Sequence, residues 1–432
     1  MNARATNGAT PDTVRGFGSL STMVIAAFGT YFCMYGFRKP FTAGQYAEPS
    51  LFGLDHKSVI VIAQVLGYLL SKFIGISVVA SLRPRQRIPM LLLLIAAAEL
   101  SLIVFGLLPT PWNAAGLFLN GLSLGMIFGI VMGYLEGRRN TEALLAGLCT
   151  SFILADGVMK SVGQWLLDLN VPEAWMPAAA GGLFLLPLYL FAMVLRRTPP
   201  PNSEDVEARS ERSPMAAADR RRCLQRYGFG LALIVLVYLL VTILRSVRAD
   251  FSREIWNGLG TTIDAGLYTR SEAGVALVIL ILNGALVAIR NNRKAFFTGL
   301  ALSMAGILIV LVAVLGWNLA IIGPFAFMVL VGLGIYMPYI AVHTTIFERF
   351  IAMTRERGTV GYFMYLADAF GYLGYVAVLF ARKIFADRQL TPMDNLLPFF
   401  LTLCLLTSGL CLLLLIPCGL FFQRRNHSSE AV

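Results

Sequence analysis

Charged residues are scarce in this sequence. Asp, Glu, Lys and Arg make up only 14% of its 432 residues, whereas 57% are hydrophobic, and the mean hydropathy is +0.72. A water-soluble chain of this length needs a much larger charged share to cover its surface. The composition therefore excludes a soluble globular protein and predicts an all-α integral membrane protein with many spans.

Sequence motifs of the common enzyme and nucleotide sites are also missing. There is no GxxxxGK[ST] phosphate loop, so ATP is not the expected energy source. An HExxH zinc motif is absent, and GxSxG does not occur in a context that suits a nucleophile. None of the six cysteines forms a CxxC pair, which argues against a zinc site and a disulfide framework. We therefore expect no enzymatic activity, no cofactor and no metal.

The positive net charge of +11 does not indicate a nucleic-acid-binding protein. Most cations lie in short segments beside apolar runs, on alternate loops, as is typical of cytoplasmic loops in membrane proteins. The segment with Arg382, Lys383 and Arg388 is the exception. We expect a multi-pass protein of the inner (plasma) membrane with both termini cytoplasmic. The regular basic segments contain Arg83, Arg85 and Arg87; Arg138 and Arg139; Arg290, Arg293 and Lys294; Arg349, Arg355 and Arg357; and Arg424 and Arg425.

Apolar windows of the length that a bilayer requires, about 20 residues, occur about twelve times. They divide the chain into an N-terminal six-helix bundle (1–195), a cytoplasmic linker (196–227) and a C-terminal six-helix bundle (228–432). Residues 1–17 are polar and lack the apolar core of a cleavable signal peptide, so the first span is expected to direct insertion. The expected spans are 18–38, 57–80, 88–108, 112–136, 142–168, 175–195, 228–250, 272–290, 295–315, 318–342, 358–381 and 396–422.

Six spans, a basic linker and six more spans predict an internal repeat. Short sequence echoes support it. Tyr31 precedes Arg38 by seven residues in the first span, and Tyr238 precedes Arg245 by seven residues in the seventh. A Leu-Ala-Asp triplet also occurs in both the fifth and the eleventh spans. These positions are equivalent in a scheme of two related halves.

Four short motifs lie in the first, second, seventh and eleventh spans: Tyr35-Gly-Phe-Arg38-Lys39-Pro-Phe41, Gly67-Tyr-Leu-Leu-Ser71-Lys72-Phe73, Val237-Tyr-Leu-Leu240 followed by Arg245 and Asp250, and Phe370-Gly-Tyr-Leu-Gly374. They resemble segments of major facilitator superfamily transporters, above all the organophosphate:phosphate antiporters, which carry glycerol phosphate and hexose phosphates. The whole chain also resembles an uncharacterised bacterial family of membrane proteins related to this superfamily. The resemblance implies 12 transmembrane helices in two six-helix halves and transport by alternating access.

The sequence differs from the antiporter pattern at several points. Pro40 stands where those transporters have Asn, and two extra residues separate Val237-Tyr-Leu-Leu240 from its arginine. The fifth span has no histidine, and the loop Ser81-Leu-Arg-Pro-Arg85 has no acid. These differences lie at positions where the resemblance implies phosphate specificity and gating contacts, so the sequence does not carry the full antiporter pattern there.

Arg38 and Arg245, one in each half, are the main candidates for a substrate site. An ionisable side chain within a span costs about 2.5–3.5 kcal/mol on insertion scales, so it should face a partner or a water-filled cavity. The planar guanidinium suits bidentate binding of phosphate or carboxylate. Two interpretations are open: the arginines bind an anion together, or each pairs with a protein carboxylate, such as Asp250 for Arg245.

Five further residues complete the predicted substrate site: Lys39, Lys72, Arg248, Tyr35 and Tyr238. The alternative for Lys39 is a side chain that extends to the lipid headgroups. Lys72 would otherwise balance an acid, and Arg248, which shares a helix face with Arg245, would otherwise lie at the external rim. The tyrosines either line the cavity or fill the core.

Asp156, Asp368 and His343 are the candidates for proton coupling, because carboxylates inside spans titrate in proton-coupled carriers. Asp156 precedes Lys160 by four residues, which also predicts an ion pair along one helix. Asp368 has no cation within one helical turn, so its alternative partner is Lys72 or an arginine across the bundle. The alternative for His343 is a structural residue with satisfied ring nitrogens.

Glycines recur every four residues in the fourth span, at Gly121, Gly125, Gly129 and Gly133. Small residues at this spacing let helices approach closely, so we expect a packing seam. Three of the cysteines recur every seven residues in the last span and should share one packing face.

These features together predict a secondary transporter of a small organic anion, such as a phosphorylated metabolite exchanged for phosphate. The lipid bilayer and the anionic substrate are its expected partners, and a monomer is its expected state. Two alternatives remain open. A transporter-like ligand sensor would need a partner-binding surface on the linker or a tail, and a lipid flippase would need an apolar opening between spans.

Overall fold

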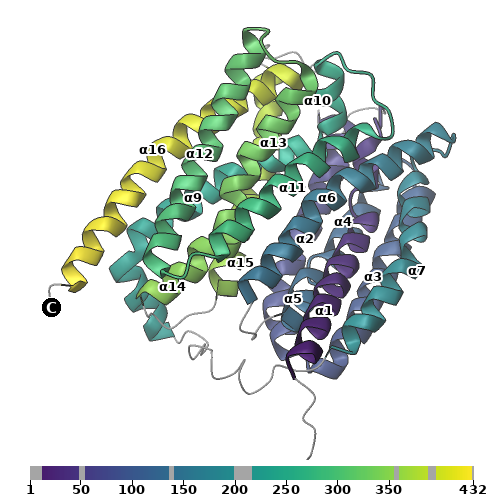
Figure 1. Cartoon of the computed structure of the whole chain (residues 1–432). Coiled ribbons are helices and arrows are strands. Elements are labelled where there is room, and N and C mark those ends of the chain that lie inside the picture. Colours follow the sequence, from purple (N-terminus) through teal and green to yellow (C-terminus); the bar gives the residue numbers. More distant parts are fainter. Residues whose placement is uncertain are drawn as a thin grey trace, which may run out of the picture.

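The computed structural model describes residues 12–47, 54–135, 141–198, 217–354, 360–387 and 396–430, and it is built of helices (Figure 1). The N-terminal half begins with a helix that breaks into two short turns. Its elements are α1 (Asp12–Met34), η1 (Tyr35–Phe37), η2 (Pro40–Ala43), α2 (His56–Ser81), α3 (Pro84–Leu107), α4 (Ala114–Leu124), α5 (Ile127–Leu135), α6 (Thr141–Asp168) and α7 (Met176–Arg196).

The C-terminal half has the longer uninterrupted helices. Its elements are α9 (Ala217–Asp250), α10 (Ser252–Gly258), α11 (Leu267–Val287), α12 (Asn292–Asn318), α13 (Pro324–Ala341), the π-helical turn η3 (Val342–Ile346), α14 (Phe347–Thr354), α15 (Val360–Asp387) and α16 (Leu396–Glu430).

Within the described ranges, ten helical segments are long and apolar enough to cross a membrane, which confirms the predicted all-helical, multi-span fold. The two other predicted spans correspond to α1 and α6. In α1 the apolar stretch, Ser21–Phe37, is shorter than the others. In α6 the 28 residues would extend about 42 Å, but four charged residues lower its hydropathy. The expected spans therefore agree with described helices throughout, because the apolar windows report burial in lipid or protein directly.

Two boundaries differ from the sequence prediction. The helix α9 begins at Ala217, so the last residues of the predicted linker are helical, while residues 199–216 lie outside the described part. The fourth span is divided between α4 and α5 at Gly125 and Met126. The division into two domains stays a prediction.

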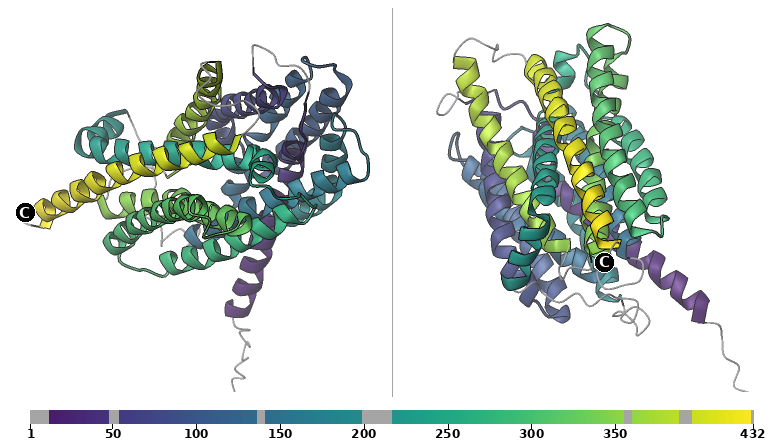
Figure 2. Two further views of the ribbon diagram at one scale, coloured as in Figure 1. Left: turned by 90° about the horizontal axis from the view of Figure 1, so that it is seen from above. Right: turned by 90° about the vertical axis from the view of Figure 1, so that its left-hand side faces the viewer.

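The two halves lie side by side, with the early helices on one side of the molecule and the late helices on the other (Figures 1 and 2). Across the junction α6 packs against α11, and α2 packs against α15. Within the halves, α2 packs on α4, and α9 packs on α15 and α16. The junction is therefore formed by α2 and α6 from one half and by α11 and α15 from the other.

Outward-facing surfaces are apolar where lipid would lie. On α3, Leu93, Leu100 and Leu107 recur every seven residues and expose 64%, 63% and 66% of their surface. On α16, which lies at the edge of the C-terminal half (Figure 2), the cysteines at 404, 411 and 418 are instead fully buried. The Cys418 sulfur lies 3.9 Å from the carbonyl oxygen of Gly230 on α9, so the cysteine face is a packing face as predicted.

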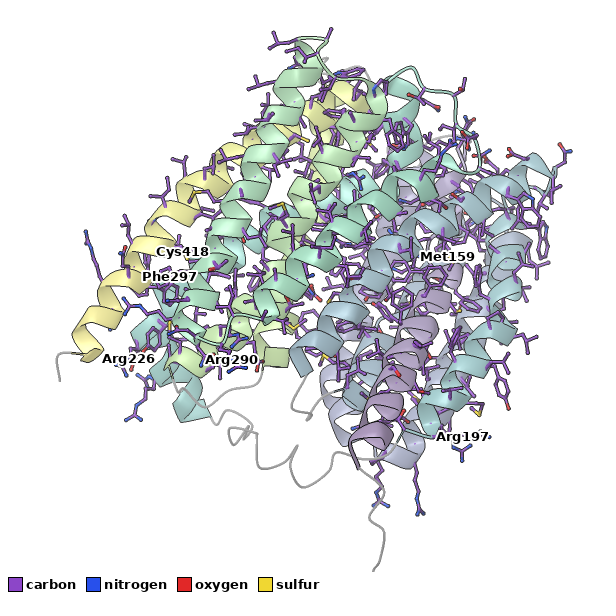
Figure 3. All side chains as sticks on the ribbon, in the orientation of Figure 1. Met159, Arg197, Arg226, Arg290, Phe297 and Cys418 are labelled. Carbon is purple, nitrogen blue, oxygen red and sulfur yellow. The ribbon has the colours of Figure 1, made fainter. Side chains whose placement is uncertain are left out.

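Basic residues mark one end of the bundle. Arg197, Arg226 and Arg290 lie at the end where α16 finishes (Figure 3). This is the end that the loop charges predict to be cytoplasmic, and the orientation itself stays a prediction. The exceptional basic segment at 382–388 falls on residues whose side chains are not described.

The glycine seam of the fourth span brings α4 against α2. A Cβ atom added at Gly121 would lie 2.0 Å from the backbone oxygen of Gln64, and one added at Gly67 would lie 2.0 Å from that of Phe118. A Cβ at Gly125 would lie 2.7 Å from the backbone oxygen of Tyr68. The two backbones therefore touch at Gly121 and Gly125, which explains the first half of the glycine repeat by packing; Gly129 and Gly133 instead lie against side chains.

Replacing Gly121 with Ala is expected to destabilise the protein, because the added methyl group forces the two backbones apart. We expect a loss of about 1–3 kcal/mol of unfolding free energy, seen as a lower midpoint of thermal unfolding in detergent. Gly274→Ala on α11 is the matched control, because nothing lies within 4 Å of its Cβ position. Equal midpoints for the two variants would contradict the close approach.

Candidate functional site

The first span is broken where its two cations stand. The helix α1 ends at Met34, and Arg38 and Lys39 lie between the turns η1 and η2. Pro40, at the first position of η2, has no backbone N–H and cannot continue the hydrogen-bond ladder of α1. The backbone amides of Arg38 and Lys39 both donate to the oxygen of Tyr35, at 3.0 and 2.9 Å. The break leaves backbone oxygens that require other donors.

Two buried amide side chains supply those donors. The Asn120 Nδ2 atom on α4 donates to the oxygens of Phe37 (3.0 Å) and Ala98 (3.2 Å). The Gln64 Nε2 atom on α2 donates to the oxygen of Arg38 (3.2 Å) and to Asn120 Oδ1 (2.9 Å). This amide pair fixes the broken segment, and therefore the root of the Arg38 side chain. The sequence signal was available, since Gln64 and Asn120 are isolated amides inside apolar spans.

The Arg38 guanidinium is enclosed by aromatic rings. Its Cζ atom lies 4.1 Å from the ring centroid of Tyr68 and 5.6 Å from that of Tyr35. The residue is only 7% exposed. In the described parts of the chain it has no carboxylate within ion-pair distance. The rings stabilise the cation by cation–π attraction but do not neutralise its charge.

Arg245 reaches the same region from an unbroken helix, α9. Its Cζ atom lies 4.5 Å from the ring centroid of Tyr339, and Nη2 lies 3.4 Å from the hydroxyl of Ser246. Its buried Nε atom has no hydrogen-bond partner in the described structure. The alternative pairing with Asp250 is not formed, because that carboxylate bonds Lys39 (2.5 Å) and the Tyr375 hydroxyl (3.0 Å).

Five other buried cations of the bundle are paired with carboxylates. Lys72 bonds Asp368 across the two halves, and Lys160 bonds Asp156 along α6, as the four-residue spacing predicted. The remaining pairs are Lys39 with Asp250 (2.5 Å) and Asp156 (3.4 Å), Arg248 with Glu272 (2.8 Å), and Lys57 with Glu254 (2.5 Å). Arg38 and Arg245 thus stand apart as buried arginines without an acid.

The two arginines line one small pocket between the halves, with a cavity volume of about 20 Å³. Both halves contribute to its wall, and most of the lining side chains are buried. The lining residues are Tyr31, Tyr35, Arg38, Tyr68, Lys72, Phe128, Phe152, Arg245, Tyr339, His343, Asp368 and Tyr372. Three cations face one carboxylate there, which leaves two positive charges when the histidine is neutral.

A hydrogen-bonded cluster forms the side of the pocket near α15. The Asp368 carboxylate accepts bonds from Lys72 and from the Tyr238 hydroxyl. The His343 Nε2 atom lies 3.5 Å from the Tyr238 hydroxyl and 3.9 Å from Asp368 Oδ1. Its Nδ1 atom lies 3.3 Å from the oxygen of Tyr339. His343 lies in the π-helical turn η3, and such turns are frequent at functional sites.

Residues 40–425 match the family described as "Family of unknown function (DUF5690)". The chain belongs to this family. No curated protein matches the sequence of the DUF5690 protein.

Among solved structures, the crystal structure of a mutant of the nucleoside transporter NupG is similar to the DUF5690 protein. The two chains are 12% identical, with a TM-score of 0.58, over 94% of this chain and 99% of that chain. At this identity the similarity shows the fold alone, which is an all-helical fold with many membrane spans. The predicted fold class is therefore confirmed.

The DUF5690 structure divides the sequence-predicted site residues into three groups. Six of them line the pocket, and Tyr238 contacts it through Asp368. Lys39, Arg248 and Asp156 are engaged in ion pairs outside the lining. Their roles in substrate or proton binding stay predictions. The six lining residues are Tyr35, Arg38, Lys72, Arg245, His343 and Asp368.

A layer of polar contacts joins the halves next to the pocket, at the end where α9 finishes. Lys39 lies between Asp156 of its own half and Asp250 of the other. Lys57 donates to the oxygens of Thr42 and Gly44, both at 2.9 Å, and to Glu254 across the junction. Arg253 Nη1 donates to the oxygen of Ala43 at 2.5 Å.

Sequence reasoning singled out Lys39 but missed the two other cations of this layer, Lys57 and Arg253. Lys57 and Arg253 lie at the ends of spans, where cations are commonplace, and three of their five hydrogen-bond partners are backbone oxygens. The layer closes the junction at the end that the loop charges predict to be external. The donors of this layer bind the last backbone oxygens of η2, at its C-terminal end. The C-terminal end of a helix carries partial negative charge and attracts cations.

The loop that follows η2 is held by Glu173. The carboxylate accepts hydrogen bonds from the backbone amides of Gln45 (2.7 Å) and Tyr46 (2.9 Å). Burial, together with the nearby carboxylate, raises the pKa of the Tyr46 phenol well above its usual value, so this side chain stays neutral.

Replacing Asn120 with Leu is expected to destabilise the broken segment. The substitution keeps the branching of the side chain but leaves the oxygens of Phe37 and Ala98 without their amide donor, and a buried unsatisfied group costs about 1–3 kcal/mol. We expect a lower midpoint of thermal unfolding in detergent. Ser123→Ala on the same helix is the control, because that hydroxyl bonds only the oxygen of Leu119 in its own turn. An unchanged midpoint for the Leu variant would show that the amide pair is dispensable.

Proposed function

We propose that the DUF5690 protein is a secondary transporter that moves a small organic dianion by alternating access. The observation that carries this proposal is a pair of buried arginines, one from each half, that line one pocket. In the described parts of the chain neither arginine has a carboxylate within ion-pair distance. Burying an uncompensated charge is expensive, so two such residues require an anion from outside the chain. A substrate is the natural source of that anion.

The charge of the pocket favours a dianion over a monoanion. Arg38 and Arg245 each contribute one unpaired positive charge, while Lys72 and Asp368 neutralise one another. A phosphate monoester or inorganic phosphate at neutral pH supplies two negative charges on one tetrahedral group. Guanidinium groups bind such a group through two parallel hydrogen bonds. The resemblance to organophosphate:phosphate antiporters points to the same substrate class.

The arrangement also favours exchange over one-way transport. An anion held by one arginine from each half ties the two halves together. When the anion leaves, the two cations repel one another in a medium of low dielectric constant, so the closed, empty state is disfavoured. The protein would then switch between its inward-open and outward-open states chiefly with an anion bound. Each anion carried in would be followed by an anion carried out, which is antiport.

Arg38→Ala and Arg245→Ala should each abolish most phosphate exchange in proteoliposomes. A hydrogen-bonded charge pair contributes about 1.5–3 kcal/mol, so we expect KM for phosphate to rise about 10- to 100-fold, with Vmax reduced as well. Arg270→Ala is the matched control, because Arg270 pairs with Asp264 at the surface and is 61% exposed. Counterflow of labelled phosphate is the measurement.

Two results would contradict the two-arginine site. One is normal exchange in both alanine variants. The other is no uptake of phosphate, a sugar phosphate or a carboxylate by the folded wild-type protein. The second result would bring forward a ligand sensor or a lipid flippase.

Asp368→Asn should separate exchange from proton coupling. The change leaves Lys72 without its partner, so the pocket gains a third positive charge. In an exchanger we expect a lower KM for phosphate and a lower Vmax, because the anion is held more tightly and released more slowly. The double variant Lys72→Met with Asp368→Asn restores the net charge and should move both constants back toward wild type.

A proton-coupled carrier would behave differently in the same assay. A pH gradient would drive uptake by the wild-type protein, and Asp368→Asn would lose this drive whether or not Lys72 is present. That outcome would replace exchange with proton symport as the transport mode.

A further inference from the structure

The pocket has two chemically distinct walls. One wall carries the cations and the tyrosines that contact them. The other wall consists of Tyr31 on α1, Phe128 on α5 and Phe152 on α6, all from the N-terminal half. We call these three residues the aromatic wall. An anion bound by the arginines would have its remaining atoms directed into the rest of this pocket.

Cations lie against the ring faces of the tyrosines in the first wall. The ring of Tyr68 lies under Arg38 at 4.1 Å and under Lys72 at 5.2 Å. The ring of Tyr339 lies under Arg245 at 4.5 Å. Their π-faces hold the guanidinium and ammonium groups in place and are not free to contact a substrate.

The aromatic wall is arranged differently. The rings of Tyr31 and Phe128 meet edge to face, with centroids 5.4 Å apart and planes at 64°. Phe152 meets the edge of Tyr339 at 5.9 Å and 87°. In the described part of the chain no cation stands over these three rings. Apart from the Tyr31 hydroxyl, the atoms of these three side chains are apolar.

This lining suits one kind of organic group better than another. Ser, Thr, Asn and Gln side chains do not line the pocket. A polyol chain or a sugar placed against the two phenylalanines would leave hydroxyl groups without partners, which is costly in a closed site. A flat aromatic group would instead gain contact area and edge-to-face packing there.

We infer that the substrate is a dianion that carries an aromatic group, with its anionic end on Arg38 and Arg245 and its ring against the aromatic wall. This inference rests on the proposed dianion transport and names the organic part of the substrate. It predicts a preference for aryl phosphates over glycerol and sugar phosphates of similar charge.

Competition in the phosphate-exchange assay tests the inference on the wild-type protein. Phenyl phosphate should inhibit labelled-phosphate exchange at about a tenfold lower concentration than glycerol 3-phosphate or glucose 6-phosphate does. Equal inhibition by the three compounds would overturn the inference while leaving phosphate exchange, and hence the proposed function, intact. Absence of phosphate exchange itself would instead overturn the proposed function.

Variants locate the preference in the aromatic wall. Phe152→Leu keeps an apolar side chain but removes the flat ring, and Phe128→Leu does the same on α5. Each should bring the ratio of the inhibitory concentrations of phenyl phosphate and glycerol 3-phosphate close to one, whatever its effect on KM for inorganic phosphate. Phe370→Leu is the matched control, because Phe370 is 47% exposed on the outer face of α15. Unaltered selectivity in both wall variants would overturn the assignment.

Discussion

The structure depends on one constraint, which is that a charge buried in a bilayer-spanning bundle must be compensated. Lys72 meets it with a carboxylate from the facing half, Lys160 with one from its own helix, and Arg248 with one from another helix of its own half. Arg38 and Arg245 meet it only in part, through tyrosine rings. The free-energy cost of removing Arg38 and Arg245 from water is therefore offset less than that of the paired cations. An exchangeable anion bound to the two arginines would supply the missing offset. The two arginines are incompletely compensated in the empty protein, so an anion that binds them supplies the missing compensation, and this contributes to its binding free energy.

The second constraint concerns the backbone, because lipid offers no hydrogen-bond partner for a broken helix. The two arginines are presented in contrasting ways. Arg245 stands on the regular helix α9, whereas Arg38 stands at the break between η1 and η2. The break is tolerated because Gln64 and Asn120 satisfy the freed oxygens, and because the glycine seam brings α2 and α4 close enough for the two amides to meet. The packing of the fourth span against α2 thus supports the Arg38 segment, through the hydrogen bonds that Gln64 and Asn120 donate to its backbone oxygens.

Local patterns in the sequence predicted most of the fold. Apolar windows located the spans, the glycine repeat located the seam between α2 and α4, and the spacing of Asp156 and Lys160 predicted their ion pair. Local patterns did not predict which residues far apart in the chain form ion pairs. Lys39 and Asp250 are 211 residues apart, and their contact depends on how the two halves dock. Six of the pocket's lining residues were predicted, Arg38 and Arg245 among them. The two phenylalanines of its aromatic wall were not, because phenylalanines inside spans look alike whether they face lipid, core or cavity.

The polar layer beside the pocket links these constraints to transport. Arg253 bonds a backbone oxygen of the opposite half, and Lys39 lies between acids from both halves, so opening this end must break both contacts at once. Opening exposes these groups to water, which replaces the lost partners, so the cost is moderate compared with breaking them in lipid. The arginines lie next to this layer, since Arg38 adjoins Lys39 in sequence. An anion that neutralises Arg38 and Arg245 lowers the repulsion that opposes closure, and so couples occupancy of the pocket to the state of the layer.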